Sequence, residues 1–149
     1  MKKRVDTHPY GLLLIMIGLI TAFPLTMLIF YPQDIPYAWA FIVPASVTGV
    51  AGLIITFYAP LSKIPKSHQE IMELGSMTVL FTWCAGFLVG ALPFSLAGRL
   101  TFCQALFDSV SAYTTTGLST LDVSITPHIF LFARGFMQFC GGLGFVMLI

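Results

Sequence analysis

The segment from Tyr113 to Thr120, YTTTGLST, contains the residues most able to bind an ion. It holds three consecutive threonines and a glycine and has no charged side chain. Backbone carbonyls and threonine hydroxyls are uncharged oxygen ligands that can replace the water around a cation. Gly117 can take backbone angles that other residues resist, so its carbonyl can turn toward an ion. The competing interpretation is a polar turn between two helices, which needs only a glycine and hydroxyl groups.

Composition places this segment in a membrane protein. Of the 149 residues, 57% are hydrophobic and only 9% are charged. A chain with so few polar groups cannot cover the surface of a soluble globule, so membrane lipid is its expected surrounding. The formal net charge of +1 gives no indication of nucleic-acid binding.

Residues that could catalyse a reaction or hold a metal are scattered along the chain. The carboxylates stand apart, and no nucleophile is paired with a base, so we expect no enzyme. The cysteines and histidines lie in or beside apolar stretches without metal-ligand spacing, so we expect no metal centre and no cofactor. CGGLG at Cys140 to Gly144 follows no strand, and we interpret it as close helix packing or local flexibility rather than nucleotide binding.

Three apolar stretches are long enough to cross a bilayer. They run over Gly11 to Tyr31, Tyr37 to Ala59, and Leu74 to Phe94. At 1.5 Å per residue, each covers the ~30 Å hydrocarbon core. Pro24 is expected to kink the first helix, and the third helix is expected to begin near His68 and end at Pro93. A signal peptide is the alternative for the first stretch, but its apolar run exceeds the usual length of such a signal.

Basic residues predict the orientation of these helices. Lys2 to Arg4 precede the first span, Lys63 and Lys66 lie two crossings later on the same side, and the opposite side offers Arg99. Because cytoplasmic loops carry the excess of lysine and arginine, the N-terminus is expected in the cytoplasm. The chain is therefore predicted to be a multi-pass protein of the cytoplasmic (inner) membrane.

A short helix is predicted between the third span and the threonines. Thr101 to Tyr113 has thirteen residues and would be ~20 Å long, too short to cross. Thr101 and Gln104 fit a capping box at its start. The next apolar stretch runs from Pro127 to Ile149, so the short helix and the threonines are expected to dip into the membrane and return.

Irregular backbone at membrane depth requires burial in protein or a water-filled cavity, because unpaired amide groups facing lipid cost several kcal/mol each. The threonine-glycine run is therefore expected to line a pore. The end of the preceding helix near Tyr113 would add the negative end of its dipole. This order of elements favours an ion filter over a simple polar turn.

These segments resemble the Trk/Ktr/HKT superfamily of potassium transporters. FDSVSAYTTTGLS resembles the end of a first pore helix with its filter, and RGFMQFCGGLGFVML resembles the start of the helix that follows. The resemblance implies an all-α integral membrane fold with two leading transmembrane helices, then a helix, pore helix, filter loop and helix. It divides the chain into a helix pair, residues 1–62, and a first pore repeat, residues 63–149.

The resemblance also assigns residues to the filter. The filter positions would be Thr114, Thr115, Thr116, Gly117 and Leu118. Potassium would be held through Thr115, Thr116 and Gly117, and a glycine at this last position accompanies potassium preference in the family. Arg134 matches a basic residue of the following helix, where its simplest role is a structural partner of the pore-loop carbonyls.

Family members carry four such repeats, whereas this chain has one TTTG motif. It looks like the first third of a longer transporter, so either further repeats or identical chains would complete the filter. The resemblance implies homodimerisation of the full-length form, a cytoplasmic nucleotide-binding regulatory subunit and potassium symport. The alternative functions are a non-transporting membrane scaffold or interaction subunit, and a non-functional fragment of the transporter.

Overall fold

The computed structural model describes residues 9–58 and 68–146, and the regular elements in these ranges are all helical. In chain order they are α1 (Pro9–Ala22), η1 (Phe23–Ile29), η2 (Pro32–Tyr37), α2 (Ala38–Tyr58), α3 (His68–Leu96), α4 (Phe102–Tyr113) and α5 (His128–Val146). The predicted all-α class is confirmed. The predicted boundary between residues 62 and 63 and the basic residues Lys2 to Arg4, Lys63 and Lys66 lie outside the described residues.

Three helical stretches in the described ranges are long and apolar enough to cross a membrane. They are Tyr10–Ile29, Pro32–Tyr58 and Glu73–Leu96, and they match the three spans predicted from the sequence. The protein is therefore a multi-pass membrane protein. α5 is not among these three stretches, and its crossing stays a prediction.

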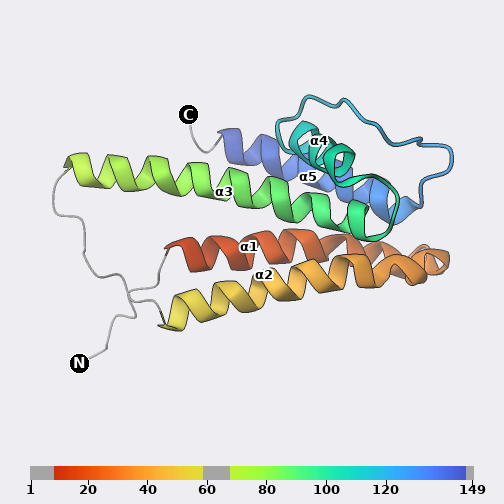
Figure 1. The fold of residues 1–149 in the computed structure, drawn as a ribbon, viewed down its shortest axis with the longest axis horizontal. Helices are drawn as coiled ribbons and strands as arrows, with labels where there is room; N and C mark the ends of the chain where they lie inside the picture. The colour runs from red at the N-terminus through yellow and green to blue at the C-terminus, as the bar shows by residue number, and fades with distance from the viewer. Residues whose placement is uncertain (1–8, 59–67, 147–149) are drawn as a thin grey trace.

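The helices form a bundle in which three connections meet at one end (Figure 1). α1 packs along α2, α3 packs against both, and α4 packs between α3 and α5. The α1–α2 turn, the α3–α4 connection and the start of α5 share one end of the bundle in Figure 1. α4 has 12 residues and is therefore ~18 Å long, and the chain after it returns to that same end without a helix.

The helix type changes next to Pro24, whereas the kink predicted there stays a prediction. α1 ends at Ala22, and the chain continues as the 3-10 helix η1 with Pro24 buried near its start. A proline has no N–H to donate to the preceding turn, and the beginning of a helix is the place where this donor is not needed.

The expected end of the third helix at Pro93 is wrong. α3 continues through Pro93 to Leu96. Proline costs one backbone hydrogen bond, and the full burial of Pro93 and Phe94 offsets that loss. The helix ends at Leu96, and the chain turns away at Gly98, whose φ of +65° lets the following Arg99 N–H donate to the Phe94 carbonyl at 3.1 Å.

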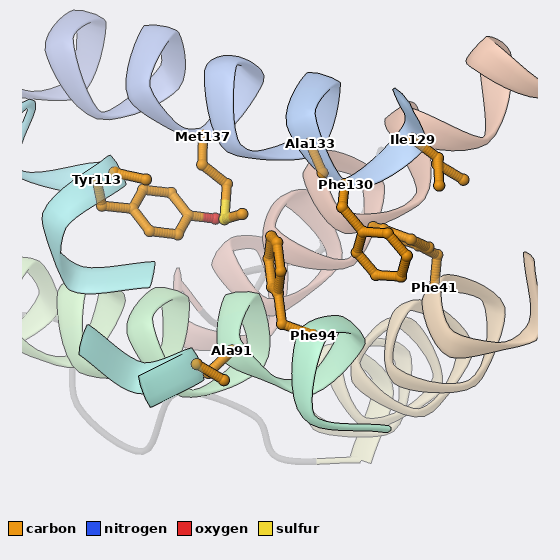
Figure 2. Packing of buried hydrophobic residues seen from close by; sticks show 10 residues of the cluster. Phe41, Ala91, Phe94, Tyr113, Ile129, Phe130, Ala133 and Met137 are labelled. Atoms are coloured by element: carbon orange, nitrogen blue, oxygen red, sulfur yellow. The ribbon is translucent and has the colours of Figure 1, made fainter. Parts of the chain in front are cut away.

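An aromatic cluster joins the leading helix pair to the later helices. Phe41 of α2 and Phe94 of α3 each face Phe130 of α5, with ring centroids 5.3 Å and 5.5 Å apart (Figure 2). All three side chains are fully buried. Burial of such rings contributes about 1.5–3 kcal/mol each. The two sequence units therefore share one core.

Close packing at Gly141 brings α5 onto the end of α4. A Cβ atom placed on Gly141 would lie only 1.9 Å from the carbonyl oxygen of Tyr113. The Tyr113 ring points toward Met137 of α5 in Figure 2. The interpretation of the CGGLG segment as a close-packing element is confirmed at this glycine.

We expect Gly141→Ala to lower the free energy of unfolding by about 1–3 kcal/mol, because the new methyl group must push α4 and α5 apart. The measurement is the thermal unfolding midpoint of the detergent-solubilised protein. Gly135→Ala on the same helix is the control, since a Cβ atom there would meet nothing within 4 Å. Equal midpoints for the two variants would contradict the packing described.

Candidate functional site

The site begins with the short helix α4, whose start is fixed by its own side chains. Gln104 Oε1 accepts a hydrogen bond from the Thr101 N–H at 3.0 Å, and the Gln104 N–H donates to Thr101 Oγ1 at 3.5 Å. The structure therefore contains the capping box at Thr101 and Gln104. It satisfies two N–H groups that the first turn of a helix leaves unpaired.

Beyond Tyr113 the chain leaves the helix through two left-handed residues. Thr115 has a φ of +58° and Gly117 has a φ of +83°. The N–H groups of Thr115 and Thr116 donate back to the carbonyls of the last turn of α4, at 2.9 Å and 3.0 Å. A left-handed conformation costs a residue with a Cβ atom about 1–2 kcal/mol, so neighbouring contacts must hold Thr115 in place.

A buried carboxylate on α4 anchors the far end of the loop. Asp108 is fully buried, and its Oδ1 and Oδ2 accept from the Thr120 N–H at 3.1 Å and 3.2 Å. The Thr120 hydroxyl donates to Asp108 Oδ2 at 2.6 Å. Hydrogen bonds to an ionised carboxylate are stronger than those between neutral groups, so this contact fixes where the loop ends.

Arg134 on α5 binds the backbone in the middle of the loop. Its Nη2 donates to the carbonyl oxygens of Gly117, at 2.9 Å, and Leu118. Its Nε lies 3.7 Å from Asp108 Oδ1, and the Ser111 hydroxyl also donates to the Leu118 carbonyl at 2.6 Å. The interpretation of Arg134 as a partner of the loop carbonyls is confirmed.

The carbonyl oxygens ahead of Gly117 have no such partner. Within residues 9–58 and 68–146, no donor binds to the carbonyl oxygens of Thr114, Thr115 or Thr116. The residues from Thr114 to Thr120 are exposed on the surface of the bundle. The hydroxyls of Thr114 and Thr116 lie 2.9 Å apart and face one another. The loop thus has carbonyl oxygens without a donor in the described residues before Gly117 and hydrogen-bonded carbonyls at Gly117 and Leu118.

The structure brings some predicted residues together and separates others. Thr114 to Leu118 form one exposed loop, whereas Thr101 and Gln104 lie at the opposite end of α4. Among the described residues, histidine, cysteine and carboxylate side chains form no cluster that could hold a metal ion.

Sequence reasoning missed Asp108 and Ser111 as supports of the loop. Asp108 was interpreted as one of several scattered carboxylates. The signal that could have found it is the pairing of a lone acid in one apolar helix with a lone base, Arg134, in the next. Ionisable residues in such helices usually pair with one another.

Comparisons with known proteins fit this arrangement. Over 99% of its length the chain is 27% identical to an uncharacterized cation transporter of Methanocaldococcus jannaschii, of which it covers 30%. It is 29% identical over 97% of its length to the Trk system potassium uptake protein TrkG of Escherichia coli, covering 29% of that protein. Over 50% of its length it is 42% identical to the Trk system potassium uptake protein TrkH of Escherichia coli, covering 16% of it. No protein-family model and no solved structure matches the chain.

The chain therefore spans less than a third of the length of these relatives. Two of the matches extend over nearly the whole chain, so they include both the leading helix pair and the threonine-glycine loop. The resemblance predicted from the sequence is confirmed: over most of its length the chain is similar to Trk-type transporters, and it corresponds to part of their length.

Proposed function

We propose that this chain is part of a potassium uptake transporter and that the loop from Thr114 to Leu118 coordinates K⁺. The single observation that carries the proposal is that Thr114, Thr115 and Thr116 are neighbouring exposed residues whose carbonyl oxygens accept no hydrogen bond from the described part of the chain. The names of the related Trk potassium uptake proteins support the choice of ion.

The chemistry is replacement of water by protein oxygens. A dehydrated cation needs several uncharged oxygens at fixed positions, which backbone carbonyls supply without binding it too tightly to leave. Asp108, Ser111 and Arg134 hydrogen-bond to the backbone of the loop. The loop therefore needs little change of conformation when it binds the ion. The Gly117 carbonyl already accepts from Arg134, and its second lone pair is left for K⁺.

The C-terminal end of α4 supports the same chemistry. The last carbonyls of a helix carry roughly half a negative elementary charge. α4 ends at Tyr113, directly before the loop, so this partial charge lies next to the proposed ion position. It favours a cation without the strong binding of a full carboxylate.

One loop surrounds only one side of an ion. We propose that further repeats of the same transporter, or identical chains, supply the remaining oxygens, as the resemblance implies. Homodimerisation, a cytoplasmic nucleotide-binding regulatory subunit and location in the inner membrane belong to this proposal.

The test of the filter is Gly117→Ser in the complete transporter. Serine should weaken the preference for potassium over sodium, because Gly117 has a φ of +83° that a side chain disfavours by about 1–2 kcal/mol. A difference of 1.4 kcal/mol between the two ions changes their affinity ratio about tenfold. The measurement is rubidium uptake competed by sodium. Wild-type competition at normal membrane abundance would overturn the filter assignment.

A matched pair at Thr120 tests the anchoring of the loop. Thr120→Ser keeps the hydroxyl that donates to Asp108 and should leave ion preference nearly unchanged. Thr120→Val removes that donor, at a cost of about 1.5–3 kcal/mol for a bond to a charged group, and should reduce uptake and ion preference. Both variants are compared in the same competition assay. If valine behaved like serine, the hydroxyl bond from Thr120 to Asp108 would have no part in holding the loop, since the backbone N–H bond remains in both variants.

Orientation is tested with alkaline phosphatase fusions, which are active only outside the cytoplasm. We expect a fusion after Asp34 to be active and one after Lys66 to be inactive, because the lysine and arginine excess keeps the second connection inside. Since the α1–α2 turn, which contains Asp34, shares one end of the bundle with the α3–α4 connection and the start of α5, this result would place that end outside (Figure 1). The reverse activities would overturn the proposed orientation.

A further inference from the structure

The turn between α1 and α2, residues 30–37, contains a buried carboxylate that the proposed mechanism does not use. Asp34 lies in η2, and its side chain is only 6% exposed. Its Oδ2 accepts a hydrogen bond at 3.0 Å from the N–H of Ile129, which is 95 residues away in the chain. Ile129 is the second residue of α5, so Asp34 binds one of the N–H groups that the start of a helix leaves unpaired.

The residues before α5 provide no such cap. Pro127 precedes the helix and has no side-chain acceptor. The hydroxyl of Thr126 donates to the Asp122 carbonyl at 2.6 Å instead. A negative side chain at a helix N-terminus also meets the positive end of the helix dipole. Asp34 therefore takes the place of a local capping residue and joins the α1–α2 turn to α5.

The α1–α2 turn also contacts the residues on both sides of the segment that contains α4 and the threonine-glycine loop. The ring of Tyr31 stacks on His128 with centroids 4.1 Å apart and planes 8° from parallel. Tyr37 meets Phe130 edge to face at 5.6 Å. The Tyr37 hydroxyl accepts a hydrogen bond from Arg99, whose guanidinium carbon lies 4.7 Å from the centre of the Tyr37 ring. The turn thus contacts the chain just before α4 and at the start of α5.

We propose that Asp34 is a positioning residue for the ion-coordinating loop. By fixing the start of α5 it fixes Arg134, which lies five residues after Ile129 and so ~7.5 Å along the helix axis. Arg134 in turn holds the Gly117 and Leu118 carbonyls. Ion preference then depends on a residue of the leading helix pair, outside the segment that contacts the ion. This inference rests on the function proposed above.

The experiment uses the complete transporter carrying Asp34→Ala, Asp34→Asn or Gln33→Ala, with rubidium uptake competed by sodium. We expect Asp34→Ala to lower the potassium preference severalfold. Asp34→Asn should lower it less, because the amide oxygen still accepts from Ile129 but carries no charge. Gln33→Ala is the control, since Gln33 is the exposed neighbour of Asp34. A residue needed only for folding would change membrane abundance without changing ion preference.

A second variant keeps the test decisive if Asp34→Ala does not reach the membrane. Asp34→Ala combined with Pro127→Asp places a carboxylate at the start of α5 itself and should recover both abundance and ion preference. Wild-type competition in Asp34→Ala and Asp34→Asn at normal abundance, with preference lost in Gly117→Ser, would overturn the role of Asp34 alone. Wild-type competition in Gly117→Ser as well would overturn the proposed function and this inference together.

Discussion

The backbone from Thr114 to Thr120 leaves helical structure in a protein whose surroundings are largely hydrocarbon. Such a segment needs a partner for each polar group, because lipid offers none. The last turn of α4 accepts from its first N–H groups, Asp108 accepts from its last, and Arg134 with Ser111 donates to the carbonyls between. Among the groups for which no residue of the described ranges provides a partner are the carbonyl oxygens of Thr114, Thr115 and Thr116, all in exposed residues.

The support behind the loop depends on two opposite charges. Asp108 is fully buried and the Arg134 side chain is 19% exposed, so either charge alone would carry a large desolvation penalty. Their separation of 3.7 Å is a weak ion pair, and each also bonds to the loop. The loop thus provides some of the hydrogen bonds that Asp108 and Arg134 need in order to be buried. The conformation of the loop and the burial of these charges therefore stabilise one another.

Local patterns in the sequence predicted the features that depend on local physics. Three long apolar runs became three helices able to span a membrane, and Thr101 with Gln104 formed the expected capping box. Pro93 misled the prediction because proline propensity is local, whereas the burial that lets α3 continue is a tertiary effect. Asp34 could not be placed at all from the sequence, since its partner is 95 residues away. Asp108 and Thr120, twelve residues apart, meet only because the chain reverses after α4.

Rigidity at the loop has to come from the helices around it. The loop's exposed residues contribute little to the apolar core, so they cannot define their own position by packing. The core instead lies at Phe41, Phe94 and Phe130, which come from α2, α3 and α5. α4 and α5, whose side chains hold the loop, are thereby packed on a cluster that includes the leading helix pair. A change in how that pair packs would move the start of α5 and, through Arg134, the carbonyls of Gly117 and Leu118. The geometry of the proposed ion site is in this sense a property of the whole bundle and extends beyond the threonine-glycine motif.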